Sequence, residues 1–283
     1  MIAPIGLLAG KTITLARETR NLNTAYIREC WDLRYFVFHL AVSDVRQRYR
    51  KSFIGVLWVL LMPVTLTLMM TFVMSTVFST SPGSYSTYVL AGLVAWDFIV
   101  QCAIGGGNTF LASEGYIKQY NRPLLLYVLR TVLANSLSLI LGSVGLICWA
   151  LFVNDSQLSV TSFALVAGWL IAIITAVPLA GLSGFMTTRY RDFGQITILG
   201  FQMVWYLSPI FITENAFRSS KVLTKMLEYN PVYHYLQFYR SPLLLDTWPT
   251  ITNYLFALIP AVILWPLFLW RLKANEKNLI YYL

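Results

Sequence analysis

The sequence predicts an all-α membrane protein that crosses the bilayer six times. Hydrophobic residues make up 57% of its 283 residues and charged residues only 12%, whereas about a quarter of an ordinary soluble domain is charged. A soluble core could not bury so much apolar surface, so we expect most of it to face lipid or other spans. The chain also contains apolar runs long enough to cross a hydrocarbon core of ~30 Å, which needs about 20 helical residues.

The first span is marked by an abrupt change of composition. Four basic residues, Arg46, Arg48, Arg50 and Lys51, precede a run without formal charge that begins at Ser52. Because Lys and Arg near the ends of spans tend to stay in the cytoplasm, residues 1–52 are predicted to form a cytoplasmic segment. The first span is then expected to begin at residue 53.

Five further apolar runs complete the predicted transmembrane domain, residues 53–270. The six spans are Phe53–Phe78, Thr87–Phe110, Thr131–Val153, Ser162–Thr187, Phe193–Ile212 and Ile251–Trp270. Both termini then lie on one side, which receives 17 of the 21 Lys and Arg residues. This asymmetry predicts that both termini are cytoplasmic, with residues 271–283 as a tail and 213–250 as an external segment. Since the net charge of +9 follows the membrane topology, we expect no nucleic-acid partner.

An amphipathic helix is expected just before the first span. Between Arg34 and Lys51, apolar residues at spacings of four, three and four share one stripe of a helix. The stripe consists of Phe38, Val42, Val45 and Tyr49. Such a helix suits the cytoplasmic interface, with its bases near the headgroups of membrane lipids. Packing against a soluble partner is the alternative, and both can hold together.

The sequence offers no site for nucleotide hydrolysis or catalysis. Residues 6–12 are similar to a phosphate-binding loop, but three residues instead of four separate Gly6 from the Gly10-Lys11 pair, and no strand precedes them. The three cysteines and two histidines lack the spacing of a metal site. No acids, histidines and nucleophile cluster as in an active site. We therefore expect a transport subunit, not an enzyme, without a metal or cofactor of its own.

Several segments carry a more specific signal as an ordered set. They are Arg46–Pro63, which contains an arginine-rich turn followed by Gly55, Trp58 and Pro63, then Ala91–Trp96, Asn121–Pro123, Tyr190–Asp192 and Asn230–His234. This set resembles the ABC-2 type permeases that export polysaccharides, over a range from about Asp44 to Pro242. Exporters of lipid-linked O-antigen are the most similar members of that family, and capsule and teichoic acid exporters are nearby.

The resemblance implies a function and an assembly. Such permeases are homodimers in the bacterial inner membrane, and two separate ATP-binding subunits below them hold the ATP and magnesium. They move lipid-linked polysaccharide, O-antigen in lipopolysaccharide biosynthesis for example, from the cytoplasmic to the outer face. An ABC-2 permease for a drug or lipid and a membrane-embedded enzyme stay as alternatives. The sequence does not specify the sugar repeat or the polymer length.

Cytoplasmic turns are the expected contacts with an ATPase. The segment from Ser113 to Pro123 is short and polar, and the resemblance implies that it is a coupling helix. Its candidate contact residues are Glu114, Tyr116, Lys118, Gln119, Tyr120, Asn121 and Arg122, with Arg189, Arg191 and Asp192 in a second, minor turn. The alternatives are a plain solvated loop for the first turn and a positive-inside anchor for the second.

A path for sugars needs aromatic rings for stacking and hydroxyls or amides for exchangeable hydrogen bonds. The candidate lining residues are Trp58, Thr65, Met69 and Phe72 in the first span, Trp96 and Asp97 in the second, and Gln202, Trp205 and Tyr206 in the fifth. Aromatic residues also gather at membrane interfaces without any ligand, which is the alternative. Asp97 is the one acid well inside a span, and we expect it to form a structural hydrogen bond or a hydrated path wall more than a proton relay.

The external segment, residues 213–250, is long, amphipathic and divided by Pro231, Pro242 and Pro249. The resemblance implies short re-entrant helices between the fifth and sixth spans, with the turn between them at Asn230-Pro231. A cap on the membrane surface is the alternative. The candidate gate residues are Arg218, Lys221, Lys225, Asn230 and Pro231, whose bases are expected to meet a pyrophosphate or lipid headgroups.

Overall fold

The computed structural model describes residues 24–77, 80–153, 159–276 and 278–283, and these residues form helices and turns only. The helices are α2 (Thr24–Asp32), α3 (Arg34–Arg48), η1 (Gly55–Leu57), α4 (Trp58–Val77), α5 (Pro82–Gly107), α6 (Glu114–Gln119), α7 (Leu125–Val153), η2 (Val160–Phe163), α8 (Ala164–Arg189), α9 (Phe193–Tyr206), α10 (Glu214–Phe217), α11 (Lys221–Tyr229), α12 (Pro231–Leu244), α13 (Ile251–Asn275) and η3 (Leu279–Tyr282). The all-α prediction is confirmed. Residues 6–12, whose sequence is similar to a phosphate-binding loop, lie outside the described residues, as do Phe78 and Lys277.

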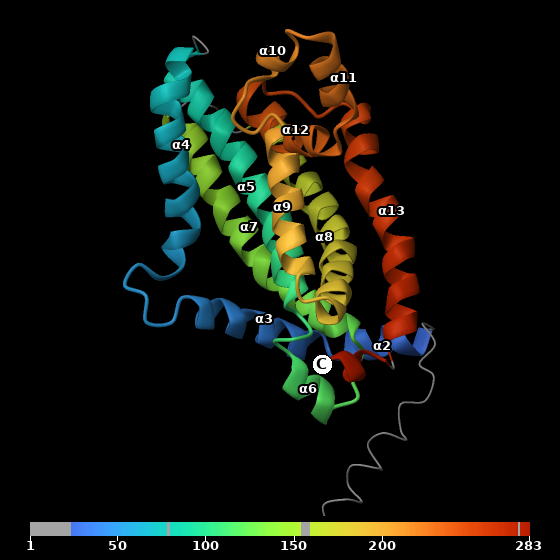
Figure 1. The fold of residues 1–283 in the computed structure, drawn as a ribbon. Helices are drawn as coiled ribbons and strands as arrows, with labels where there is room; N and C mark the ends of the chain where they lie inside the picture. The colour runs from blue at the N-terminus through green and yellow to red at the C-terminus, as the bar shows by residue number, and fades with distance from the viewer. Residues whose placement is uncertain (1–23, 78–79, 154–158, 277) are drawn as a thin grey trace, which may run out of the picture.

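Five helices of the described chain are long and apolar enough to cross a membrane. They are Gly55–Val77, Pro82–Gly107, Leu125–Val153, Val160–Arg189 and Ile251–Asn275. Each coincides with one of the predicted spans, although the second, third and fourth begin up to six residues earlier than predicted. In Figure 1 they run side by side in one bundle; the first four alternate in direction, and α13 runs in the same direction as α8, because the shorter α9 lies between them in the chain.

The predicted fifth span, Phe193–Ile212, forms a shorter helix than expected. The helix α9 has 14 residues and ends at Tyr206, so at 1.5 Å per residue it is about 21 Å long and falls short of a ~30 Å hydrocarbon core. The early end follows from Pro209, which disfavours helical backbone at Ser208 and supplies no N–H of its own. The helix still runs along the bundle beside α8 (Figure 1).

The helix α5 lies at the centre of the bundle, where it packs against α4, α7, α8, α9 and α12. Small residues allow the closest approach, as in other membrane bundles. A Cβ atom added to Gly106 of α5 would lie 2.4 Å from the Cα atom of Ala180 in α8. Beside this contact, the ring of Phe185 stacks on Phe110 and Phe268, with centroids 4.8 and 6.3 Å away. Close backbone packing therefore fixes α5 against α8.

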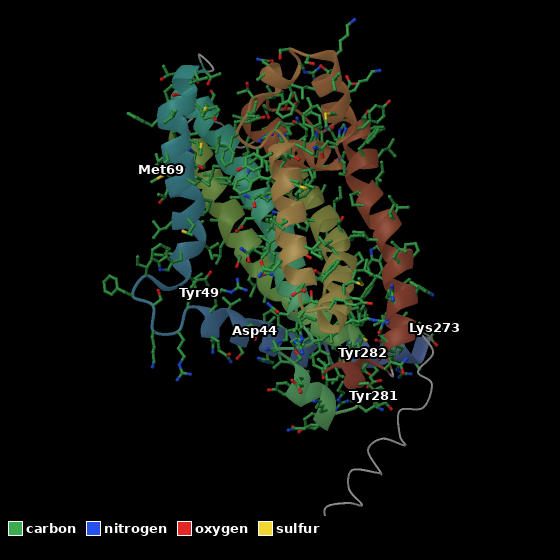
Figure 2. The ribbon with its side chains drawn as sticks, in the orientation of Figure 1. Asp44, Tyr49, Met69, Lys273, Tyr281 and Tyr282 are labelled. Atoms are coloured by element: carbon green, nitrogen blue, oxygen red, sulfur yellow. The ribbon has the colours of Figure 1, made fainter. Side chains whose placement is uncertain are left out.

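Both ends of the described chain lie at one end of the bundle. The helices α2, α3 and α6 and the C-terminal turn η3 gather there, whereas α10, α11 and α12 cover the opposite end (Figure 1). Figure 2 marks Asp44 of α3 and Tyr281 and Tyr282 of η3 at this shared end. The carboxylate of Glu276 joins them, because it accepts hydrogen bonds from the Tyr26 hydroxyl at 3.4 Å and the Leu124 amide at 3.2 Å.

The predicted helix before the first span is present as α3, and it packs against the bundle through a face other than the predicted apolar stripe. Val37 and Ala41 are 3% and 1% exposed, and the helix packs against α7. Phe38, on the predicted stripe, is exposed. An ion pair between Asp44 and Arg130 of α7 lies on the same face as Val37 and Ala41 and fixes the rotation of the helix. Contact between the predicted stripe and lipid stays a prediction.

Candidate functional site

A cavity of about 650 Å³ lies between α4, α5 and α9; we call it the central groove. It brings together residues from three predicted spans that are distant in the sequence. The predicted path residues that line it are Trp58, Thr65, Met69, Trp96, Asp97, Gln202 and Trp205. Three tryptophans, a hydroxyl, a carboxylate and an amide therefore share one wall, the combination expected for a sugar path.

Two predicted path residues lie elsewhere. Phe72 is 85% exposed and does not line the groove. Tyr206 is exposed and borders a separate, smaller hollow with Phe217 and Met226. Phe72 is seven residues beyond Thr65, so drift of the helical repeat and the separation of α9 from the outer half of α4 leave it outside the groove.

Contacts between aromatic rings position the tryptophans of the groove. The Trp96 ring meets Phe201 edge to face at 5.8 Å between centroids, and the Trp205 ring lies 5.4 Å from Phe211. The indole Nε1 of Trp205 is enclosed and has no hydrogen-bond partner among the described residues. An enclosed indole N–H usually finds a partner, so this donor is an exception beside the groove.

Apolar side chains make up the rest of the lining, and the sequence analysis did not single them out as path residues. They are Leu61, Met62, Pro63, Leu66, Leu93, Val100, Ile104, Ile198 and Phe201. On α5 the signal was present, because Leu93, Trp96, Val100 and Ile104 recur at helical spacing. In a uniformly apolar span such a stripe cannot be distinguished in the sequence, since every face of the helix is hydrophobic.

Asp97 lies between the central groove and a second cavity of about 310 Å³. The second cavity contains Arg48 and Tyr49 from the end of α3 and Gln101 from α5. Its polar groups are connected in pairs: Gln101 Nε2 donates to Asp97 Oδ1 at 3.5 Å, and Arg48 Nη2 donates to Asn135 Oδ1 at 3.3 Å. A polar route thus leads from the end of α3 to the groove, and Asp97 forms part of its wall.

The predicted coupling segment folds as the short helix α6 at the end of the bundle that holds α2 and α3 (Figure 1). Ile117 is buried and anchors it, whereas Tyr116 and Tyr120 are 42% and 54% exposed. Glu114 and Lys118 form an ion pair one turn apart. The other predicted contact residues, Gln119, Asn121 and Arg122, are also exposed. The segment thus presents a polar surface with two aromatic rings.

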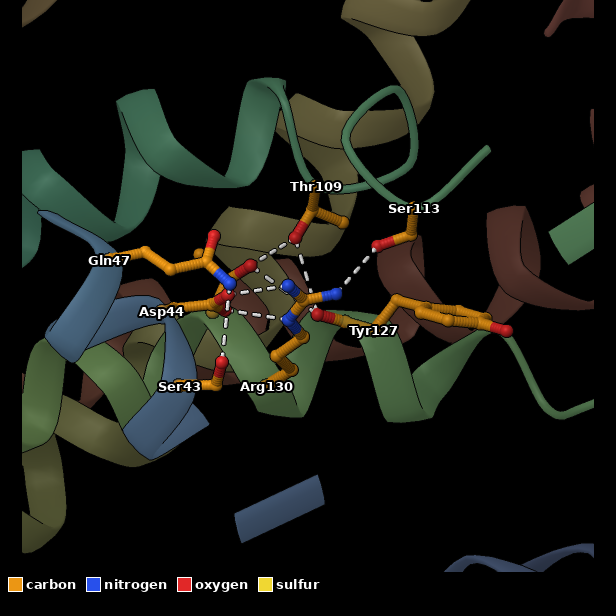
Figure 3. A network of polar contacts seen from close by, with 8 residues as sticks. Ser43, Asp44, Gln47, Thr109, Ser113, Tyr127 and Arg130 are labelled. Atoms are coloured by element: carbon orange, nitrogen blue, oxygen red, sulfur yellow. Dashed lines mark hydrogen bonds and ion pairs between the residues drawn. The ribbon is translucent and has the colours of Figure 1, made fainter. Parts of the chain in front are cut away.

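Polar contacts hold the coupling segment to α2 and α3 at both of its ends. On one side, Arg130 donates to both carboxylate oxygens of Asp44 and, at 3.4 Å, to the Ser113 hydroxyl (Figure 3). On the other side, Arg122 lies 3.9 Å from Glu29 of α2, next to the Leu124 amide that donates to Glu276. Arg130 belongs to α7, so these contacts join α2, α3, α7 and the α6 segment into one polar unit.

The turn between α8 and α9 contains Arg191 and Asp192, both exposed. The Arg189 guanidinium lies over the rings of Tyr190 and Tyr282, at 5.5 and 5.6 Å from their centroids. Cation–π contacts of this kind are weak at exposed sites. The turn therefore adjoins the C-terminal η3 and is separate from α6.

The backbone of the arginine-rich turn before α4 explains why a glycine occupies position 55. Gly55 has a φ of +62°, and its amide donates to the Ser52 hydroxyl at 3.1 Å. Lys51 also has a positive φ of 66°. Left-handed backbone favours glycine, so the turn needs Gly55 in order to place Trp58 at the start of α4. Arg46, Arg50 and Lys51 are exposed beside it.

At the opposite end, α11 ends at Tyr229 and α12 begins at Pro231, so the predicted turn at Asn230-Pro231 is confirmed. Asn230 caps α12 by accepting from the Val232 amide at 2.9 Å. Ten of the 14 residues of α12 are buried, and the helix packs against α5, α8 and α13. The predicted gate bases Arg218, Lys221 and Lys225 are exposed on the outside of this end.

Side chains satisfy the non-helical backbone between α9 and α10. Tyr88 donates to the carbonyls of Pro209 and Ile212 at 3.0 and 3.1 Å, and Tyr85 donates to that of Phe211 at 2.8 Å. The remaining bonds are Asn230 Nδ2 to Leu207 O at 3.2 Å and Arg240 Nη2 to Ile210 O at 3.1 Å. Irregular backbone is tolerated at membrane depth where protein satisfies it in this way.

The fold and the groove define a polytopic helical membrane protein with an internal aromatic and polar cavity.

No model of a protein family matches the sequence. The chain is a distant homologue of O-antigen export system permease proteins called RfbA. It is 25% identical over 205 residues to one from Klebsiella pneumoniae, covering 70% of this chain and 77% of the relative. It is 19% identical over 216 residues to one from Myxococcus xanthus, covering 76% and 82%. The chain is therefore similar, at distant identity, to permease proteins of export systems.

Proposed function

We propose that this chain is the permease subunit of an ATP-driven ABC-2 exporter that moves lipid-linked polysaccharide, O-antigen-like in type, from the cytoplasmic to the outer face of a bacterial inner membrane. The observation that carries the proposal is the central groove. Distant relatives that serve O-antigen export give the class of cargo, and three tryptophans beside Thr65 and Gln202 give a surface suited to sugar rings and hydroxyls.

We propose six crossings with both termini in the cytoplasm. The helix α9 would cross together with the loop that follows it, residues 207–212, whose carbonyls are bonded by side chains. The excess of basic residues at the end with α2, α3 and η3 supports a cytoplasmic location for that end. On this topology α12 is the main re-entrant element, which agrees with its burial among α5, α8 and α13.

A second copy of the chain would complete the path. None of the 14 residues of α9 is buried, and Gln202 exposes an amide on this helix. An amide facing lipid alone is costly. We place the partner copy, or the hydrated cargo, against this face, so that the groove of each copy opens toward the other.

Two ATP-binding subunits would supply the energy, with ATP and magnesium held on them. The helix α6 is the proposed contact, because Tyr116 and Tyr120 are exposed aromatic side chains of the kind that anchor interfaces. Movement of α6 would reach α3 through Ser113, Arg130 and Asp44, and from α3 the turn at Gly55 leads directly into α4, one wall of the groove.

The test is deletion of the gene in the cell that makes the glycan, followed by complementation. Lipid-linked glycan should accumulate at the cytoplasmic face, and the wild-type chain should restore export. A Trp58→Ala, Trp96→Ala double variant should restore membrane insertion but only a small part of export, whereas Trp248→Ala, at an exposed site of the opposite end, should restore both. Normal surface glycan in the deletion strain would refute the export function.

A further inference from the structure

A cavity of about 430 Å³ lies at the outer end of the bundle, between the first turns of α5, the start of α10 and the second half of α12. We call it the outer cavity, and its volume lies within the range of roughly 300–1,000 Å³ that is usual for small-molecule sites. Its walls combine aromatic rings, a carboxylate, amides and a guanidinium, from Tyr85, Tyr88, Glu214, Asn215, Gln237 and Arg240. It is separate from the central groove, with which it shares no lining residue.

Arg240 is only 2% exposed, and its hydrogen bonds are incomplete. Nε donates to Tyr88 O at 3.3 Å and Nη2 to Ile210 O at 3.1 Å, and the guanidinium lies 3.5 Å from the centroid of the Tyr88 ring. Nη1 is enclosed and has no hydrogen-bond partner among the described residues. A buried donor without an acceptor is costly, above all on a charged group. Arg240 therefore lines the outer cavity and has, behind that wall, a donor without an acceptor.

The surrounding sequence makes room for this guanidinium. A Cβ atom added to Gly92 of α5 would lie 2.7 Å from Arg240 Nη2, so even alanine at this position would displace the side chain. Arg240 is thus a buried cation beside the cavity with one donor still unpaired, and an acceptor in the cavity would lower the cost of its burial.

The carboxylate of Glu214 favours a neutral ligand over an anionic one. Its carboxylate accepts from the Tyr233 hydroxyl at 3.0 Å and from Gln237 Nε2 at 2.6 Å. No ion pair of Glu214 or Arg240 occurs within the described residues. An anion would therefore meet an unneutralised carboxylate on the same wall. A hydroxyl group suits both, since it accepts from Arg240 and donates to Glu214.

We propose that the outer cavity is a saccharide subsite that holds one sugar unit of the exported glycan as the chain leaves the permease. This proposal rests on the proposed export function. The sugar hydroxyls would pair with Arg240, Glu214 and the Asn215 amide, and its CH face would lie against the tyrosine wall, where the rings of Tyr85 and Tyr88 are inclined by 20°. By binding one sugar unit, the site would slow the return of the glycan toward the cytoplasm between successive cycles of ATP hydrolysis.

Photo-crosslinking tests the site directly. p-Benzoylphenylalanine replaces the exposed Asn215 in the full chain, which is expressed with its ATPase in cells whose glycan is radiolabelled. Irradiation should give a labelled glycan adduct, and Glu214→Gln in the same chain should reduce it roughly tenfold, the loss expected for one hydrogen bond to a charged group. The control places the crosslinker at Val222, exposed on α11 at the same end. Equal labelling from both positions, or adducts with phospholipid only, would overturn the proposal.

A cavity-filling variant avoids the structural role of Arg240, whose replacement would also release Ile210. Asn215→Trp should lower export about fivefold or more with unchanged thermal stability, and Val222→Trp should leave export unchanged. Normal export by Asn215→Trp would refute the subsite alone, provided that deletion of the chain still traps glycan inside the cell. Failure of the deletion to trap glycan would instead refute the export function, so the two failures are distinguishable.

Discussion

The two ends of the bundle are held together by different kinds of contact. At the end with α2, α3 and α6, ion pairs join side chains of separate segments, as in Asp44–Arg130 and Glu29–Arg122. At the end with α10, α11 and α12, side chains donate to backbone carbonyls of a loop, as Tyr88 does to Pro209 and Ile212. The ion pairs connect one helix to another, so a displacement of one helix can move the next. The hydrogen bonds to carbonyl oxygens instead hold the loop after α9 in place.

The difference matches the two proposed tasks. A coupling end must move as a unit when an ATPase pushes on α6, and its polar unit connects α6 to α3 and α2. An exit end must stay closed until cargo arrives, and bonds from α5 and α12 hold residues 207–212 there. The predictions below test each end separately, in order of decreasing effect.

The largest effect is expected at the exposed tip of the coupling end. The double change Tyr116→Ala, Tyr120→Ala removes both aromatic side chains of α6 and should weaken binding of the ATPase about a hundredfold, since buried interface aromatics commonly contribute 2 kcal/mol or more. Co-purification of the two subunits in nanodiscs measures it. Trp248→Ala, an exposed aromatic at the other end, serves as the control, and unchanged ATPase binding in the double variant would exclude α6 as the contact.

The next largest effect is expected for the Asp44–Arg130 ion pair. Arg130→Gln removes a two-oxygen contact with a carboxylate that is partly buried and should cost about 2 kcal/mol of stability, with a matching loss of ATP-driven export. Arg122→Gln, whose ion pair spans 3.9 Å at the surface, should cost well under 1 kcal/mol.

A double-mutant cycle separates coupling from simple destabilisation. Asp44→Asn and Arg130→Gln together should cost less than the sum of the two single changes, because the second change no longer leaves a charge unpaired. Additive costs would show that the two side chains act independently and that the polar unit does not connect α3 with α7.

The sequence predicted the helices and most of the groove because both depend on local properties. Apolar runs and the basic residues before Phe53 located five spans, and helical spacing grouped Trp58 with Thr65. The end of α9 was missed by six residues, although Ser208-Pro209 offered a local signal for it. Pattern and length alone favoured a full span there, and the compensating bonds to residues 207–212 come from Tyr85, Tyr88 and Arg240, far away in the chain.

The rotation of α3 and the outer cavity could not be predicted for the same reason. Hydrophobic spacing selected the stripe of Phe38 and Val42 for contact with lipid, but it gave no signal for the face that packs against α7. That face is set by Asp44, whose partner Arg130 is 86 positions away. Arg240 was counted among external bases, and its burial beneath Gly92 follows only from the approach of α12 to α5. Pairings between distant segments decide which polar residues become sites.

At the exit end, Tyr88→Phe should destabilise the loop after α9. The change keeps the ring over Arg240 but removes the hydroxyl that donates to the carbonyls of Pro209 and Ile212, and it should cost between about 1 and 2 kcal/mol. Thermal unfolding in nanodiscs measures the loss, and labelling of an Ile212→Cys reporter should become faster. Tyr206→Phe, which alters an exposed hydroxyl, is the matched control, and equal stability of both variants would show that the loop does not depend on Tyr88.

The smallest effect is expected for the cap of α12. Asn230→Ala removes the acceptor of the Val232 amide at 2.9 Å and the donor to Leu207 O and Ser208 Oγ, and loss of such a cap costs about 1 kcal/mol. Ser81→Ala removes the cap of α5, which accepts from the Ser84 amide at the longer distance of 3.4 Å and should cost less. Because Asn230 also connects α12 to the loop after α9, Asn230→Ala should speed labelling of Ile212→Cys, whereas Ser81→Ala should not. Equal labelling in the two variants would mean that Asn230 only caps its helix and that Tyr88, Tyr85 and Arg240 hold the exit loop without it.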